Sequence, residues 1–225
     1  MTPSEQTIPR EILEFCERCA EGLRGLKNPR DCITYIQKEL PLLLRERDLF
    51  IGLLQDAVGG HSFLDPRRPT MFDNELVVYV AQDRLFSLRM YLWGPGEFST
   101  PHDHNAWGVL GPLSDGYSVT NYRREDDESR KGYARLTEVE HFTLNQGETT
   151  STLPLKAGIH KTGNPTEETL ISLNLYGKSL PRGYINGFEL ETNRVFPILP
   201  PRRKKEYLLF SALVTLKKDA AGPGN

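Results

Sequence analysis

Two histidines two residues apart, His102 and His104, form the pattern in this sequence that most clearly could do chemistry. They lie in the segment 94–108, GPGEFSTPHDHNAWG, directly after a strongly strand-like run. In an extended strand, residues i and i+2 point to the same face. The two imidazoles can therefore meet at one point, as a metal site requires, and the rest of the chain has to supply a third ligand.

The elements that position this segment fall into two groups. Residues 8–58 are predicted to be helical, in three helices broken at Asn28-Pro29, near Pro41 and at Gly59-Gly60. After Gly60, short β-rich runs alternate with turns, at 76–81, 85–93, 107–110, 117–123, 133–144, 149–155 and 169–176. This spacing predicts a sandwich or small barrel. We therefore expect a helical region, 1–60, packed on a mainly β barrel with a C-terminal extension, 61–225.

Composition narrows the possible partners and compartment. The chain has 225 residues and a formal net charge of -2, so no overall charge bias favours nucleic acid or an anionic membrane. No apolar run approaches the roughly 20 residues that span a bilayer, and the first residues lack a secretory pattern. Cys16, Cys19 and Cys32 are an odd set that suits a reducing cytoplasm. Cys16 and Cys19 follow the apolar period of a helix, which predicts core packing. His61 and His141 are expected at the surface.

Two blocks resemble the paired sequence motifs of the cupin superfamily. The first runs from Gly96 through His102 and His104, and the second runs from Gly147 through Pro154, Gly158 and His160 to Asn164. The resemblance implies a double-stranded β-helix, or jelly-roll barrel, with His102, His104 and His160 as metal ligands. The glutamate that usually follows the second histidine is missing from residues 105–109. The implied site is three neutral imidazoles, which suit Fe(II), Zn(II), Ni(II) or Cu(II).

A finer resemblance is to the cysteine dioxygenase-type thiol dioxygenases. It rests on Trp93-Gly-Pro-Gly, then PHDHNAWG at 101–108, Gly158-Ile-His160-Lys and SLNLY at 172–176. The bacterial branch that includes 3-mercaptopropionate dioxygenases looks more similar, since it also has Trp-Gly after the histidine pair. This resemblance implies an Fe(II) enzyme that uses O2 to oxidise a small thiol, cysteine-like or 3-mercaptopropionate-like, to its sulfinate.

The surroundings of the implied iron depart from that family. The family has Ser-x-His-x-Tyr on a late strand, whereas this chain has Ser172, Asn174 and Tyr176, which period-2 geometry places on one inward face. Tyr176 can offer its hydroxyl to substrate or O2. Asn174 can donate and accept hydrogen bonds but cannot titrate as histidine does. The cysteine that is crosslinked to this tyrosine in the animal enzymes corresponds to Val109, so that crosslink is absent.

Substrate recognition is the least determined part. The carboxylate-binding arginine of the family falls on Ala81 by rough alignment. An arginine fork is the natural partner of a carboxylate. Arg182 is the first candidate, with Trp93 and Trp107 as pocket wall, and the other candidates are Arg84, Arg89 and Arg123. If no arginine points inward, we expect a substrate without a carboxylate.

Other functions stay open from the sequence. A three-histidine cupin could cleave a C–C bond in a diketone-like chelator, or use Zn(II) as a Lewis acid. It could also be a non-enzymatic sensor with a remnant site. The run Arg202-Arg-Lys-Lys205 could contact an anionic partner, although a solvated charge run is the default. Oligomeric state is not determined by these patterns.

Overall fold

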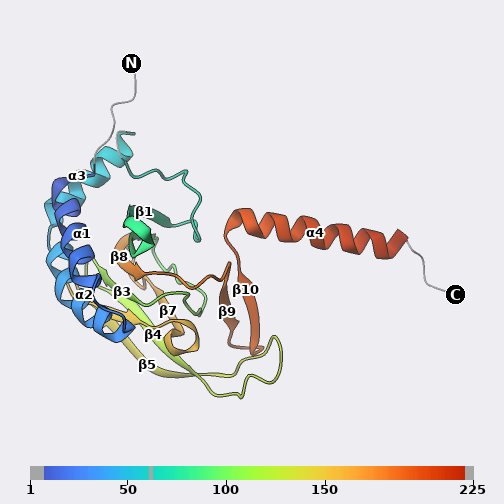
Figure 1. The fold of residues 1–225 in the computed structure, drawn as a ribbon. Helices are drawn as coiled ribbons and strands as arrows, with labels where there is room; N and C mark the ends of the chain where they lie inside the picture. The colour runs from blue at the N-terminus through green and yellow to red at the C-terminus, as the bar shows by residue number, and fades with distance from the viewer. Residues whose placement is uncertain (1–7, 61–62, 221–225) are drawn as a thin grey trace.

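The computed structural model describes residues 8–60 and 63–220, and Figure 1 shows their arrangement. His61, expected at the surface, lies outside the described residues, as do residues 221–225.

Three N-terminal helices form one layer: α1 (Arg10–Leu23), α2 (Pro29–Leu44) and α3 (Arg47–Val58). The Asn28 side chain caps α2 by accepting a hydrogen bond from the Arg30 backbone N–H. The prediction that a helix breaks near Pro41 is wrong, because Pro41 lies inside α2. The apolar face of α2 continues past it to the buried Leu43 and Leu44, and burial of that face outweighs the one backbone hydrogen bond that proline cannot donate.

Antiparallel strands form the rest of the core. A five-stranded sheet has the order β1-β2-β8-β3-β6, and a three-stranded sheet has the order β5-β4-β7. A hairpin of β9 and β10 adds to the second side. The bounds are β1 (Glu75–Val80), β2 (Phe86–Trp93), β3 (Gly108–Pro112), β4 (Tyr117–Arg124), β5 (Leu136–Leu144), β6 (Thr150–Thr152), β7 (His160–Gly163), β8 (Leu170–Gly177), β9 (Ile185–Glu189) and β10 (Arg194–Ile198). Two 3-10 turns, η1 (Gln82–Arg84) and η2 (Leu155–Gly158), precede β2 and β7.

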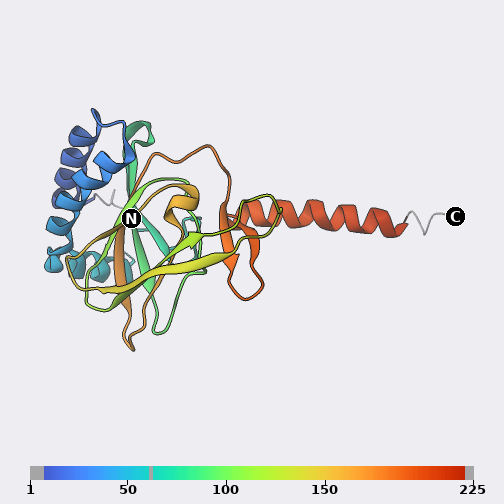
Figure 2. The same ribbon diagram turned by 90° about the horizontal axis from the view of Figure 1, so that it is seen from below.

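Alternation along β2 shows how the layers meet. Leu88 and Met90 are fully buried in a core shared with the helices, whereas Tyr91 and Trp93 belong to a second core shared with β4 and β8. Period-2 side-chain geometry explains this division. The helical layer therefore covers the outer face of the five-stranded sheet, and both views show it on one side of the strands (Figures 1 and 2). The predicted mainly β barrel with an N-terminal helical layer is confirmed.

The C-terminal part holds elements that we did not predict. The β9–β10 hairpin is followed by α4 (Pro201–Ala220), which begins with the basic run 202–205 and projects away from the barrel in both views (Figures 1 and 2). α4 leaves Leu209, Phe210 and Leu216 about two-thirds exposed, at 72%, 67% and 67%. Among the described helices, none is both long and apolar enough to cross a bilayer.

The three cysteines are free and buried. Cys16 and Cys19 lie in the core between α1 and its neighbours, as the helical period predicts. Burial raises the pKa of Cys16 to about 12, so its thiol stays protonated near neutral pH. Core packing therefore accounts for both residues.

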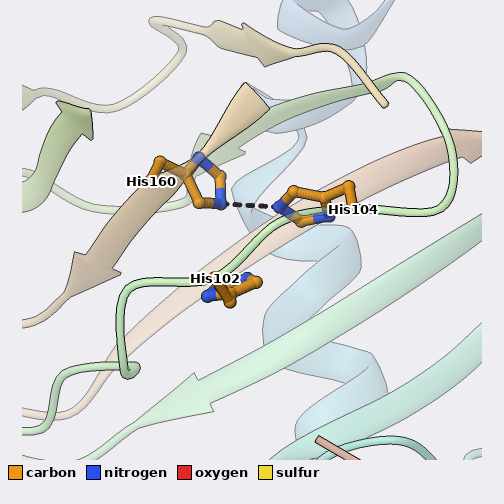
Figure 3. A group of neighbouring side chains, drawn as sticks. All are labelled: His102, His104 and His160. Carbon is orange, nitrogen blue, oxygen red and sulfur yellow. Dashed lines mark hydrogen bonds between the residues drawn. The ribbon is translucent and has the colours of Figure 1, made fainter. Parts of the chain in front are cut away.

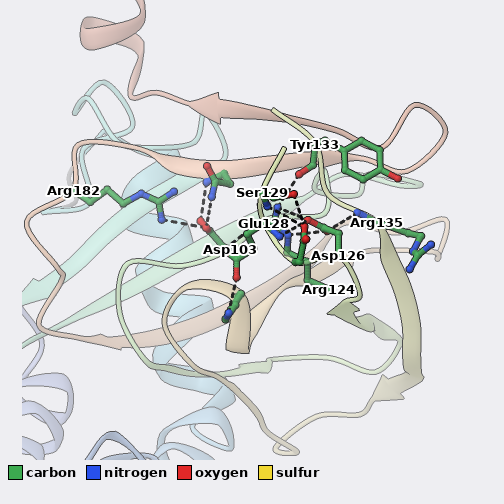
Figure 4. Close-up of polar contacts among 11 residues, drawn as sticks. Asp103, Arg124, Asp126, Glu128, Ser129, Tyr133, Arg135 and Arg182 are labelled. Carbon is green, nitrogen blue, oxygen red and sulfur yellow. Dashed lines mark hydrogen bonds and ion pairs between the residues drawn. The ribbon is translucent and has the colours of Figure 1, made fainter. Parts of the chain in front are cut away.

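The charged segment between β4 and β5 is a hairpin tip held by ionic contacts, drawn in Figure 4. Arg124 donates to both carboxylate oxygens of Asp126 at 2.9 Å, and Asp126 also accepts backbone N–H groups from Glu128 and Arg135. The hydrogen bonds from Arg124 are the main reason that the pKa of Asp126 lies well below its usual range.

Candidate metal centre

The three histidines of the sequence motifs meet in the structure. His160 begins β7, and its backbone forms a two-way bridge with His102 (His102 N to His160 O 2.9 Å, His160 N to His102 O 3.1 Å). Within residues 102–104 only His102 forms isolated bridges, and there is no regular strand, so the strand geometry assumed from the sequence is only local. The bridge between His102 and β7 brings the histidine pair next to His160.

The imidazoles converge on one small volume, as Figure 3 shows. One ligand atom from each of His102, His104 and His160 lies within 4.8 Å of the others. The Nε2 atoms of His104 and His160 are 2.8 Å apart. All three residues are buried, with 4%, 7% and 3% of their surface exposed.

Burial also keeps these rings neutral. Desolvation is the largest cause that lowers the pKa of each histidine, and the charges of His160 and His102 lower that of His104 further. The Nδ1–H of His102 donates to the Thr100 carbonyl at 2.8 Å, which leaves its Nε2 lone pair free. Neutral imidazoles with free lone pairs are the form that binds metals.

The residues present fit a divalent transition metal. Two imidazole nitrogens that each bind one ion at about 2.0–2.1 Å and at a right angle lie about 2.9 Å apart. The separation of 2.8 Å between His104 and His160 agrees with that arrangement. Among the described residues, the clustered group contains no carboxylate and no thiol. The site is therefore a neutral three-histidine centre that could hold a divalent metal.

The residue between the two ligands has a supporting role. Asp103 is 2% exposed, and its carboxylate accepts hydrogen bonds from the Asn186 backbone N–H (2.7 Å), the Asn186 amide (2.8 Å) and Arg182 (3.1 Å) (Figure 4). These contacts tie the histidine segment to β9. Phe188 N also donates to the Pro101 carbonyl at 2.8 Å. The C-terminal hairpin thus fixes the position of His102 and His104.

Tyr176 lies against the histidines. Its ring stacks on His104, with centroids 5.6 Å apart and planes at 25°. The Asn174 amide donates to the Tyr176 hydroxyl at 2.9 Å, and Tyr91 forms a second hydrogen bond with that hydroxyl. Burial raises the pKa of Tyr176 to about 12, so the phenol stays protonated near neutral pH. With Asn174 as donor to its oxygen, the Tyr176 proton remains available for a group in the cavity.

Two glycines allow the Tyr176 and Trp107 rings to pack closely on the backbone. A Cβ on Gly108 would lie 2.6 Å from the Tyr176 ring, and one on Gly177 would lie 2.2 Å from the Trp107 ring. Tyr176 and Trp107 therefore pack directly on neighbouring backbone.

Ser172 and Trp93 lie deeper in the barrel. The Trp93 indole N–H donates to the Ser172 hydroxyl at 3.1 Å, and Ser172 is fully buried. The predicted common face of Ser172, Asn174 and Tyr176 agrees with the register, in which they pair with Tyr91, Arg89 and Ser87 of β2. Ser172 accepts the Trp93 hydrogen bond, while Tyr176 stacks on His104 and Asn174 lines the same cavity as His102 and His160.

A cavity of 330 Å³ opens onto this site, a size that suits a small ligand. Besides the histidines, seven of its lining side chains are aromatic or aliphatic: Phe72, Tyr91, Trp93, Phe98, Tyr176, Phe196 and Ile198. Its carboxylates are Asp73 and Glu97, and no lysine or arginine is among the described residues that line it. The buried Oδ1 of Asn174, another lining residue, has no hydrogen-bond partner. The cavity thus offers acceptors and no cation.

The structure places two predicted substrate residues outside this cavity. Arg182 pairs with Asp103, and its guanidinium lies 4.3 Å from the centroid of the Tyr184 ring. A role of Arg182 in substrate binding would require that ion pair to open. Trp107 lies in the core shared with the helices. Trp93 does line the cavity, as predicted.

The other candidate arginines also lie elsewhere. Arg123 is paired with Glu125 at 2.7 Å, while Arg84 and Arg89 line a second cavity. Arg89 forms a 2.7 Å ion pair with Glu75, which is 6% exposed. Sequence reasoning missed Glu75 and Tyr91 as neighbours of the site. Only Tyr91 gave a signal, as a hydroxyl-bearing residue inside the apolar run of β2, because Glu75 directly follows Asp73 and Asn74 at the start of β1.

Comparison with known proteins assigns neither a family nor an activity. No protein-family model matches the chain. A Cupin 2 conserved barrel domain protein from Salinispora arenicola CNS-205 is 15% identical over 51% of this chain and 84% of its own, with a TM-score of 0.35. The Cupin_2 domain of an XRE family transcriptional regulator from Enterobacter cloacae is 17% identical over 48% and 96%, with a TM-score of 0.32.

An oxalate decarboxylase from Lactobacillus farciminis, solved as a formate complex, is 18% identical over 50% of this chain and 31% of its own, with a TM-score of 0.35. At such values the similarity carries no argument about substrate or reaction. The antiparallel sheets enclosing the histidine site make the fold of this chain a cupin double-stranded β-helix with an N-terminal helical layer.

Proposed function

We propose that this protein is a non-haem Fe(II)-dependent dioxygenase that oxidises a small thiol to its sulfinate with O2. The observation that carries the proposal is the buried set of three neutral histidines with the protonated Tyr176 stacked beside it. When bound, iron would supply the positions at which a thiolate and O2 react. The choice of iron and thiol rests on the resemblance of residues 93–108, 158–161 and 172–176 to the thiol dioxygenases.

The side chains have separate roles in this proposal. His102, His104 and His160 hold the metal, and among the described residues no carboxylate belongs to this group, so the positive charge of the ion is left to be balanced by a substrate thiolate. Tyr176 donates a hydrogen bond to the reacting group, and Asn174 keeps the Tyr176 hydroxyl oriented. Trp93 and Phe98 form part of the wall that excludes water from the reacting atoms.

Oxygen uptake by the iron-loaded protein tests the reaction. We expect anaerobic loading with Fe(II), followed by addition of a thiol and O2, to consume one O2 per sulfinate formed. Metal analysis of the protein as purified separates the alternatives: stoichiometric zinc with retained turnover would favour a Lewis-acid enzyme. No uptake with any of cysteine, 3-mercaptopropionate, cysteamine and mercaptosuccinate would rule the thiol reaction out.

The charge of the cavity predicts which thiol is preferred. Asp73, Glu97 and the unpartnered Oδ1 of Asn174 are acceptors, and no described lining residue is a cation. A substrate ammonium would satisfy these groups, whereas a carboxylate would be repelled. We expect kcat/KM for cysteamine to exceed that for 3-mercaptopropionate by about tenfold or more, which corresponds to roughly 1.4 kcal/mol.

Removing the negative charge of Glu97 tests the expected preference for cysteamine. Glu97→Gln should reduce the ratio of kcat/KM for cysteamine to kcat/KM for 3-mercaptopropionate. Glu125→Gln, at an exposed ion pair outside the cavity, should leave this ratio unchanged. Faster turnover of 3-mercaptopropionate by the unaltered protein would contradict the charge argument and leave the dioxygenase proposal standing.

A further inference from the structure

A second cavity, of 780 Å³, shares no described lining residue with the metal cavity. It is bounded by η1, the start of β2, the segment that follows β8 and the first turn of α4. The volume is within the range of ligand sites, about 300–1,000 Å³. Nothing in the proposed dioxygenase reaction uses it.

The charged side chains that line this cavity are all positive. The cavity is lined by six cationic side chains from five separate segments, Arg68, Arg84, Arg89, Lys178, Arg182 and Arg203. No aspartate or glutamate is among the described lining residues. The whole chain carries a net charge of -2, so this concentration is not a consequence of composition.

Most of these cations lack an acidic partner. Arg89 and Arg182 pair with Glu75 and Asp103 behind the cavity wall. Among the described residues, Arg68, Arg84, Lys178 and Arg203 form no ion pair with a carboxylate within 4.0 Å. All four are exposed, so water and salt screen their mutual repulsion, and together they make the shared space attractive to an anion.

Two further features point into the same region. Asp83 and Arg84 both have left-handed backbone, with φ of 55° and 53°. Leu85 N donates to the Gln82 carbonyl at 3.2 Å, so these two residues are the central pair of a type I′ turn between β1 and β2, and this turn holds Arg84 in the cavity lining. The Nε atom of Arg89 is buried without a hydrogen-bond partner, although the side chain as a whole is 24% exposed. Arg89 thus brings an unsatisfied buried donor to the cavity lining, next to its ion pair with Glu75.

We propose that this cavity is a binding site for a small polyanion that carries several phosphoryl groups. Four unpaired cations call for more than one negative charge, and arginine forks suit phosphate oxygens. Val80, Phe86, Leu180 and Pro181 form the apolar part of the lining and can accept an uncharged portion of the ligand. The basic run of α4 thus has a specific role through Arg203.

Isothermal titration with tripolyphosphate at constant ionic strength tests this site. We expect saturable binding of one tripolyphosphate per chain. The double variant Arg84→Ala/Arg203→Ala should weaken it by about tenfold or more, because two charge-assisted contacts are lost. The matched control Arg24→Ala/Lys27→Ala removes two exposed cations from the end of α1 and should bind as the unaltered protein does.

The arms of this experiment separate the outcomes. Tighter binding of adenosine triphosphate than of tripolyphosphate would show that the apolar lining contributes to a nucleotide site. Equal weakening in both double variants would mean general surface charge and overturn the proposal, as would the absence of saturation. Lys178→Ala alone, at an exposed lining position, gives a milder variant if the double substitution perturbs folding.

Discussion

Replacing His160 by alanine is expected to abolish metal binding and turnover together. His160 is one of three ligands, and its Nε2 lies 2.8 Å from that of His104, so the substitution leaves two donors. Loss of an outer-shell partner alone costs about 10–100-fold in metal affinity, so loss of a ligand should exceed about 100-fold. Iron content after desalting and O2 uptake in the presence of thiol measure the two effects.

The matched control is His141→Ala. His141 is exposed on β5, where its Nδ1 hydrogen-bonds to Thr120, and it lies outside the cluster. It should retain iron and turnover. The folded state of both variants can be checked by circular dichroism. Full turnover by a folded His160→Ala protein would show that the three-histidine group is not the reactive centre.

The second large effect is expected on stability, from Asp103→Ala. Asp103 is buried between two ligands and accepts hydrogen bonds from Asn186 and Arg182. Removing one partner of a buried ion pair typically costs about 3–5 kcal/mol, since the other charge is left without compensation. Urea unfolding of the metal-free protein should show a loss of this size in the free energy of unfolding.

Glu125→Ala provides the comparison for Asp103. Its ion pair with Arg123 is exposed, and such pairs contribute about 0–1 kcal/mol. Asp103→Asn should fall between the two, because an amide keeps one acceptor for the Asn186 N–H. A loss below about 1 kcal/mol for Asp103→Ala would contradict the structural role assigned to the carboxylate.

The sequence was sufficient for the parts of the molecule that depend on local spacing. The interval from His102 to His104, the Gly-Ile-His block and the period-2 run from Ser172 to Tyr176 are each short patterns with fixed geometry. The structure brings them together as predicted. The strand alternation likewise predicted the barrel.

What the sequence did not reveal depends on contacts between distant residues. Arg182 looked like a substrate ligand because it follows Tyr176, yet its partner Asp103 lies 79 positions earlier. The helix across Pro41 depends on burial of the apolar face of α2 against the strands, which propensity does not include. α4 was missed because its apolar residues follow no helical period and its basic run resembles a solvated tail.

The contacts between the histidine segment and β9 have a consequence for when the histidine site forms during synthesis. His102 bridges to Gly187, and the Asp103 carboxylate is held by Asn186, so the histidines reach their final support only when the chain through β9 is present. Domains generally fold as units during synthesis. A nascent chain that ends before residue 187 carries all three histidines but not the framework that orients them. A metal held by these histidines would therefore meet its preformed site only in the completed barrel.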